Sequence, residues 1–158
     1  MAFPKVGNMA PAFTLLDQDG KKVSLKDFRD NSNVVLYFYP KAMTPGCTNQ
    51  ACGIRDSQAA YKRAKTVVLG VSPDPVARLG KFIEKEGLNF TLLSDEDKAI
   101  TEKYGCWGLK KFMGRESMGV LRTTFIIGKD GKLKHIMDKV KTKSHHEDVL
   151  AVIKELGI

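Results

Sequence analysis

The sequence predicts a single α/β domain over residues 1–158, in which a mixed sheet is covered by helices on both faces. Two apolar runs, at 34–39 (VVLYFY) and 66–72 (TVVLGVS), are typical of strands that are buried on both sides. Helical patterns follow each run, which is the alternation expected of an α/β fold. A chain of 158 residues suits one domain with one hydrophobic core.

The N-terminal part predicts a hairpin and then the first buried strand. Residues 13–16 and 22–25 flank the sequence DQDG, which places Gly20 in a tight turn. After the strand at 34–39, a helix is expected over 45–64. Strand 66–72 follows.

The middle of the chain continues the alternation. A helix is expected over 75–86, where Gly87 is a typical stop. A short strand covers 91–94, and Asp95 is positioned to cap a helix that runs to about Tyr104.

The C-terminal part predicts a second hairpin and a closing helix. Residues 123–127 (TTFII) and 132–138 flank an Asp-Gly turn. Ser144 caps a final helix that reaches Leu156. The whole pattern indicates an α/β sandwich of the thioredoxin-like type with an N-terminal β-hairpin.

Composition and charge argue against several classes of protein. The formal net charge is +8 and the pI is about 9.4, yet basic residues are spread along the chain. The densest basic stretch, 108–115, lacks the interleaved aromatics of a nucleic-acid surface, so a solvated basic face is favoured. No apolar run approaches the roughly 18 residues of a membrane span. The N-terminus does not resemble a secretion signal, and a cytoplasmic location is expected.

The three cysteines favour neither a disulfide scaffold nor a metal site. An odd number argues against a purely structural framework. A structural zinc site needs four ligands, whereas Cys106 is isolated and His145-His146 lies far along the chain. No cofactor or metal is predicted.

The segment PKAMTPGC places a cysteine at the start of a helix. Pro40 ends the buried strand, because it cannot donate to a sheet. Thr44 suits the N-cap, and Pro45 and Gly46 suit the first two helical positions, so Cys47 falls third. The free N–H groups and the dipole of a helix start stabilise an anion there. A reactive thiolate is therefore favoured, although a small buried filler residue fits the same pattern.

Cys52 lies five residues after Cys47. In an intact helix their Cα atoms would be about 8 to 9 Å apart, beyond the roughly 7 Å limit for a disulfide. The pair can bond only if the helix unwinds, and Gly53 weakens the helix locally. From spacing alone, Cys52 could also be a buried helix residue without chemistry.

At this point the sequence resembles a known family. Pro40, Thr44 and Cys47 match the P-x-x-x-T-x-x-C signature of the peroxiredoxins, closely that of the bacterioferritin comigratory protein or peroxiredoxin Q branch. The resemblance continues nearly throughout the chain, in GNMAPAF, LGVSPDP, NFTLLSDED and RTTFIIGKDGK.

The resemblance implies a thiol peroxidase that reduces hydrogen peroxide and organic hydroperoxides. Cys47 corresponds to the peroxidatic cysteine, which becomes a sulfenic acid. Thr44, Arg122 and the Cys47 backbone N–H correspond to the groups that hold the peroxide, Arg122 also favours the thiolate, and Pro40 shields the sulfenic acid. Cys52 corresponds to the resolving cysteine of an intramolecular disulfide, which thioredoxin or a similar dithiol reductant reduces. A monomer or weak dimer is implied.

Some residues fall outside this pattern. Gln50 stands where many peroxiredoxins carry Glu, and it also occurs in this branch. Cys106 matches no catalytic position and is interpreted as structural. His145-His146 is assigned to the first turn of the last helix, and the cluster of Trp107, Phe112 and Met113 to core packing.

Two other functions compete with the peroxidase hypothesis. A thioredoxin-like thiol–disulfide oxidoreductase would carry C-x-x-C and a proline before its later strand, whereas this chain has x4 spacing and Arg122-Thr123-Thr124. A basic nucleic-acid or chaperone-like module would need a concentrated basic stripe, which the sequence lacks.

Overall fold

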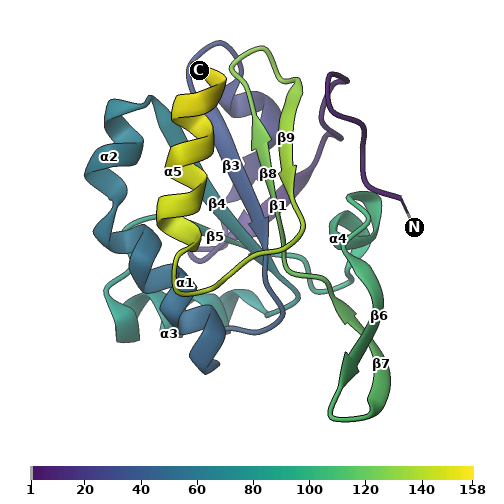
Figure 1. Ribbon diagram of the computed structural model, residues 1–158. Coiled ribbons are helices and arrows are strands. Elements are labelled where there is room, and N and C mark those ends of the chain that lie inside the picture. Colours follow the sequence, from purple (N-terminus) through teal and green to yellow (C-terminus); the bar gives the residue numbers. More distant parts are fainter. Residues whose placement is uncertain (1) are drawn as a thin grey trace.

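The computed structural model describes residues 2–158 and contains a seven-stranded sheet and a separate hairpin (Figure 1). The order of the large sheet is β2-β1-β5-β4-β3-β8-β9. Its strands are β1 Thr14–Asp17, β2 Lys22–Ser24, β3 Asn33–Phe38, β4 Thr66–Ser72, β5 Thr91–Ser94, β8 Thr123–Ile127 and β9 Leu133–Met137. Strands β3, β4 and β5 are parallel to one another, while β8 runs antiparallel to β3. The predicted thioredoxin-like mixed sheet, with its N-terminal hairpin β1–β2, is confirmed.

Strand β3 divides the core into two halves. Its six residues are all buried, as the continuous apolar run predicts. Side chains alternate across the sheet, so Val35 and Tyr37 enter one cluster and Leu36 and Phe38 the other. Both faces of the sheet must therefore be covered.

Helices cover the two faces unequally. One face carries α1 Pro45–Asp56, α2 Gln58–Arg63, α3 Val76–Glu86 and α5 His145–Leu156, whose apolar residues join the first cluster. The other face carries the short 3-10 helix η1 Leu25–Phe28, α4 Ala99–Lys103 and the N-terminal segment. In Figure 1, α5 lies along the front of the sheet beside α1. Within residues 2–158, no helix is long and apolar enough to cross a membrane.

Two predicted helices differ from the observed ones. The helix expected over 45–64 is divided at Ser57, whose backbone (φ −104°, ψ 6°) leaves the α region. The helix expected after Asp95 begins later, at Ala99. Asp95 nevertheless binds its first turn, since its carboxylate accepts hydrogen bonds from the backbone N–H groups of Ile100 and Thr101.

The sequence did not predict the hairpin formed by β6 Trp107–Phe112 and β7 Arg115–Val120, which projects from the body in Figure 1. Met113 and Gly114 form its two-residue turn, and both have positive φ. The core-packing prediction is wrong for Met113, which is 87% exposed, whereas Trp107 packs half-buried against the second cluster. The Phe112 side chain lies outside the described residues.

Candidate active site

Cys47 lies at the third position of α1, as the sequence predicts. Thr44 is the N-cap, Pro45 opens the helix, and the Cys47 side chain is 2% exposed. The buried side chains of α1 recur at Cys47, Gln50, Ala51 and Ile54, which is the spacing of one helix face. The thiol therefore sits on the inner face of α1, at the end where the backbone N–H groups are free.

Arg122 brings a positive charge to this thiol. It precedes β8, and Thr123 pairs with Phe38 of β3, so Arg122 lies at the edge of the sheet where α1 begins. Its Nη1 donates to Cys47 Sγ over 3.4 Å and to Gln50 Oε1 over 2.7 Å. A hydrogen-bonded guanidinium stabilises a thiolate in preference to a thiol.

A chain of hydrogen bonds continues behind Arg122 into the core. Gln50 Nε2 lies 3.2 Å from His145 Nδ1, and His145 Nε2 lies 2.7 Å from Thr124 Oγ1. His145 is 1% exposed, and burial lowers its pKa to about 4. This chain of hydrogen bonds therefore contains a neutral imidazole near neutral pH. Its residues come from α1, α5 and β8, so the contacts behind Cys47 join three elements.

The loop between β3 and α1 is held by residues that sequence reasoning missed. Asp74 Oδ2 accepts a hydrogen bond from the backbone N–H of Ala42 over 2.8 Å. Arg78 Nη2 donates to the Ala42 carbonyl over 3.0 Å, and Arg78 Nε lies 3.2 Å from Asp74 Oδ1. Arg78 lies in α3 and Asp74 in the turn that leads into it. A neighbouring element therefore holds this loop in place.

Pro40 and Thr44 lie in this loop, both half-buried. The Thr44 hydroxyl donates to the Lys41 carbonyl over 2.8 Å and makes no side-chain cap to α1. Thr44 thus occupies the predicted N-cap position without the predicted capping bond. The two residues lie at the entrance to the helix that carries Cys47.

Tyr37 lies beside the site on the same face of the sheet. Burial raises the pKa of its hydroxyl, and the neighbouring Tyr39 and Cys47 raise it further. Both tyrosines are nearly inaccessible to solvent, so on this side the thiol faces neutral and poorly hydrated side chains. Charge interactions are strengthened in such surroundings.

Cys52 lies on the same intact helix, half-buried, and both cysteines are free thiols. Its Sγ lies 3.6 Å from Glu86 Oε2 at the end of α3. The predicted geometry holds to this extent: the two thiols share a folded helix at a spacing too long for a disulfide.

Cys106 is separate from this site. It is 0% exposed in the second core cluster, and its Sγ lies 3.7 Å from the Tyr104 carbonyl oxygen. Burial raises its pKa to about 12, which keeps the thiol protonated and unreactive. This agrees with the structural interpretation of Cys106.

Comparisons with known proteins match nearly the whole chain to one family. The model of the AhpC/TSA family matches residues 6–136. Peroxiredoxin Bcp of Escherichia coli is 53% identical over 151 residues, which covers 96% of both chains.

Solved structures agree with the sequence comparison. The bacterioferritin comigratory protein of Xanthomonas campestris has a TM-score of 0.87 and 30% identity, covering 96% of this chain and 98% of that one. A PrxQ mutant of Xylella fastidiosa has a TM-score of 0.92 and 27% identity over the full length of both chains.

Proposed function

Because the chain belongs to the AhpC/TSA family and is a peroxiredoxin homologue of the Bcp and PrxQ type, we propose that Cys47 is its peroxidatic cysteine. The observation that carries this assignment is the placement of Cys47 at a helix start with the Arg122 guanidinium donating to its sulfur over 3.4 Å. The function is peroxide reduction, with Cys47 as the nucleophile.

The first step is attack of the Cys47 thiolate on one peroxide oxygen. The O–O bond breaks, the sulfur becomes a sulfenic acid, and the leaving oxygen takes a proton to become water or an alcohol. Arg122 can donate to the oxygens as charge moves from sulfur to the leaving group. Thr44 and the backbone N–H of Cys47 lie at the same helix start and are the other proposed peroxide ligands, while Pro40 limits access of water.

The second step joins Cys47 to Cys52. The Cys52 sulfur displaces the sulfenic hydroxyl, which leaves as water, and an intramolecular disulfide forms. Thioredoxin or a similar dithiol protein is the proposed reductant. Both hydrogen peroxide and organic hydroperoxides are proposed substrates, and the similar Xanthomonas campestris protein is described as having alkyl peroxide reduction activity. A cytoplasmic monomer or weak dimer remains a prediction.

Substitution kinetics test both roles. Cys47→Ser should reduce peroxide consumption to the uncatalysed background, because no other described thiol has the same surroundings. Cys52→Ser should still undergo the first oxidation of Cys47 but should not cycle with thioredoxin, because no disulfide forms for thioredoxin to reduce. For both variants, the loss of peroxide is measured in the presence of thioredoxin, thioredoxin reductase and NADPH.

Cys106→Ser provides the matched control, because that thiol is buried in the opposite half of the core. Full activity is expected of it. Continued cycling of Cys52→Ser would transfer the resolving role to another thiol, and an active Cys47→Ser would remove the basis of the proposal.

A further inference from the structure

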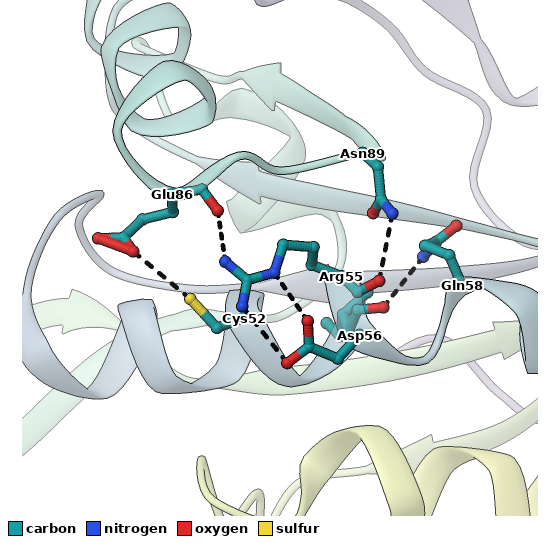
Figure 2. A network of polar contacts seen from close by, with 7 residues as sticks. Cys52, Arg55, Asp56, Gln58, Glu86 and Asn89 are labelled. Carbon is teal, nitrogen blue, oxygen red and sulfur yellow. Dashed lines mark hydrogen bonds and ion pairs between the residues drawn. The ribbon is translucent and has the colours of Figure 1, made fainter.

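The second half of α1 is tied to the end of α3 by a polar network that the peroxide chemistry does not use (Figure 2). Cys52 Sγ donates to Glu86 Oε2 over 3.6 Å, and Arg55 Nη1 donates to the Glu86 backbone carbonyl. Just beyond α3, Asn89 Nδ2 donates to the Arg55 carbonyl over 3.2 Å. Three contacts thus hold residues 52–55 of α1 against α3 and the loop that follows it.

The position of the Glu86 carboxylate is not explained by the stability of α3. Glu86 is the last residue of that helix, where a negative charge faces the negative end of the helix dipole. The helix end is already closed by Gly87, which has a φ of 59° and donates to the Ile83 carbonyl, and by Arg55. What the carboxylate itself contacts is the Cys52 thiol, as Figure 2 shows.

Arg55 does not neutralise this carboxylate. Its guanidinium is directed to Asp56, with Nε and Nη2 lying 2.9 Å and 3.3 Å from the two carboxylate oxygens. Its remaining donor goes to the backbone oxygen of Glu86, not to the side chain. Arg55 thus forms no ion pair with the Glu86 carboxylate, although its positive charge still acts on both Glu86 and Cys52.

The surroundings of Cys52 as a whole favour its neutral form, and burial is the largest cause. Burial raises the pKa of the thiol, Arg55 lowers it, and the charge and hydrogen bond of Glu86 raise it, as does Asp56. From α5, His146 packs against the neighbouring Gly53. A carboxylate that accepts a hydrogen bond from a thiol stabilises the protonated state, because the thiolate would repel it.

We propose that Glu86 is a positioning residue that delays disulfide formation: it holds the Cys52 thiol, with its hydrogen still on sulfur, against α3 until α1 unwinds. The inference rests on the proposed resolving role of Cys52 and adds the group that controls it. While the contact persists, Cys52 is neither a thiolate nor free to reach Cys47.

Release of this contact permits the resolving step. The Cys52 thiol loses its proton, its sulfur bonds to Cys47 Sγ, and the S–O bond of the sulfenic acid breaks. The departing hydroxyl and the proton leave as one water molecule, so no further oxidant or reductant is needed. The contact with Glu86 therefore slows resolution and lengthens the life of the sulfenic acid, which a second peroxide can oxidise to the sulfinic acid.

Glu86→Gln tests the inference, with Glu84→Gln as its control. Gln keeps the size and the acceptor oxygen of Glu86 but removes its charge, whereas Glu84 is exposed on the same helix. The first measurement is the pH dependence of Cys52 alkylation, followed by peptide mass spectrometry in a Cys47→Ser background. The midpoint should shift to lower pH in Glu86→Gln and stay unchanged in Glu84→Gln. Glu86→Asp, which restores the charge, should move it back toward that of the parent protein.

The second measurement is the fraction of Cys47 that becomes sulfinic acid during turnover at fixed peroxide. With otherwise unaltered cysteines, Glu86→Gln should lower this fraction about two-fold or more, because a freer thiol resolves faster. The rate of the first oxidation of Cys47 should stay unchanged.

The two levels of the hypothesis fail in different ways. If mass mapping of the peroxide-treated parent protein finds no Cys47–Cys52 disulfide, the proposed resolving role is wrong. If that disulfide forms but Glu86→Gln matches Glu84→Gln in either the alkylation midpoint or the sulfinic fraction, only the role of Glu86 is overturned. An unchanged midpoint would do so even if the variant lost stability, since alkylation reports on Cys52 directly.

Discussion

Gln50 orients the polar residues behind Cys47 because its two amide atoms meet different partners. Arg122 can only donate, so the Gln50 atom 2.7 Å from it is the carbonyl oxygen, and the NH₂ group faces His145 Nδ1. Nδ1 therefore accepts, and the proton of the neutral ring lies on Nε2, which donates to Thr124. His145 is also the first residue of α5, where the helix dipole disfavours a cation.

His145 makes folding sensitive to mild acid. Its pKa of about 4 in the folded protein lies below the ordinary value of 6.5, so the unfolded chain takes up the proton first. As pH falls through this interval, the free energy of unfolding should decrease by up to about 3 kcal/mol on account of this one residue. His145→Asn should lose correspondingly less stability between pH 7 and pH 4.5, measured by urea unfolding.

His135→Asn is the matched control for this prediction, because His135 lies on β9 outside the polar chain. It should retain the acid sensitivity of the parent protein. An equal loss of stability in His145→Asn and the parent protein would contradict the assignment.

For single residues, the sequence predicts only positions that depend on adjacent residues. Thr44, Pro45 and Gly46 are adjacent, so the place of Cys47 in its helix could be predicted from cap preferences. The contact between Gln50 and His145 spans 95 residues and depends on how α5 docks. No local pattern encodes such a contact, and the pair His145-His146 is equally consistent with an ordinary helix start.

At the scale of elements, Gly53 determines how closely α5 approaches α1. A Cβ atom at this position would lie 2.2 Å from His146 Nδ1 and 2.8 Å from Cγ of the same ring. The sequence suggested only that Gly53 weakens the helix. The structure adds a reason for glycine, because α5 packs where another residue would carry a side chain.

Two alanine substitutions separate these effects. Gly80→Ala in α3 should stabilise the protein by up to about 1 kcal/mol through helix propensity, because its Cβ would meet only Gln18 O, at 3.7 Å. Gly53→Ala gains the same propensity but overpacks the contact with His146, so a net loss of about 1 to 3 kcal/mol is expected. Thermal unfolding of the two variants measures both values, and a stabilised Gly53→Ala would refute the packing argument.

The hairpin β6–β7 shows why one element escaped prediction. Its turn has positive φ at two successive residues, a geometry for which Asn-Gly or Asp-Gly is the usual signal. Met113 occupies the first of these positions, and much of the hairpin is exposed, so neither turn chemistry nor a buried apolar run marked it. The large sheet was predictable because burial imposes continuous apolar runs on β3 and β4.

At the scale of the whole molecule, the proposed disulfide should destabilise the protein. Closing so short a loop stabilises a chain by only about 2 kcal/mol in the entropy model. Unwinding α1 would expose Ala51 and Ile54, which are fully buried, and break the contacts of Cys47 with Arg122 and of α1 with α5. Exposure of one large apolar side chain alone costs about 1.5 to 3 kcal/mol.

The oxidised protein should therefore melt at a lower temperature than the reduced protein and show weaker helical circular dichroism. Protein treated with one equivalent of peroxide is compared with the same protein after reduction by dithiothreitol. Cys52→Ser, which is oxidised without forming the disulfide, should keep its helix content. Unchanged helicity in the fully disulfide-bonded protein would rule out the intrahelical bond.

The position of α3 has a consequence for how far such a rearrangement can spread. Through Asp74 and Arg78, α3 and the turn before it hold the backbone that enters α1, and through Glu86 α3 binds Arg55 near the exit of α1. Helix α3 and the turn before it thus hold both ends of the segment that is proposed to unwind. If the disulfide forms as proposed, the unfolding should therefore stay between these two attachment points and leave the sheet beneath α1 intact.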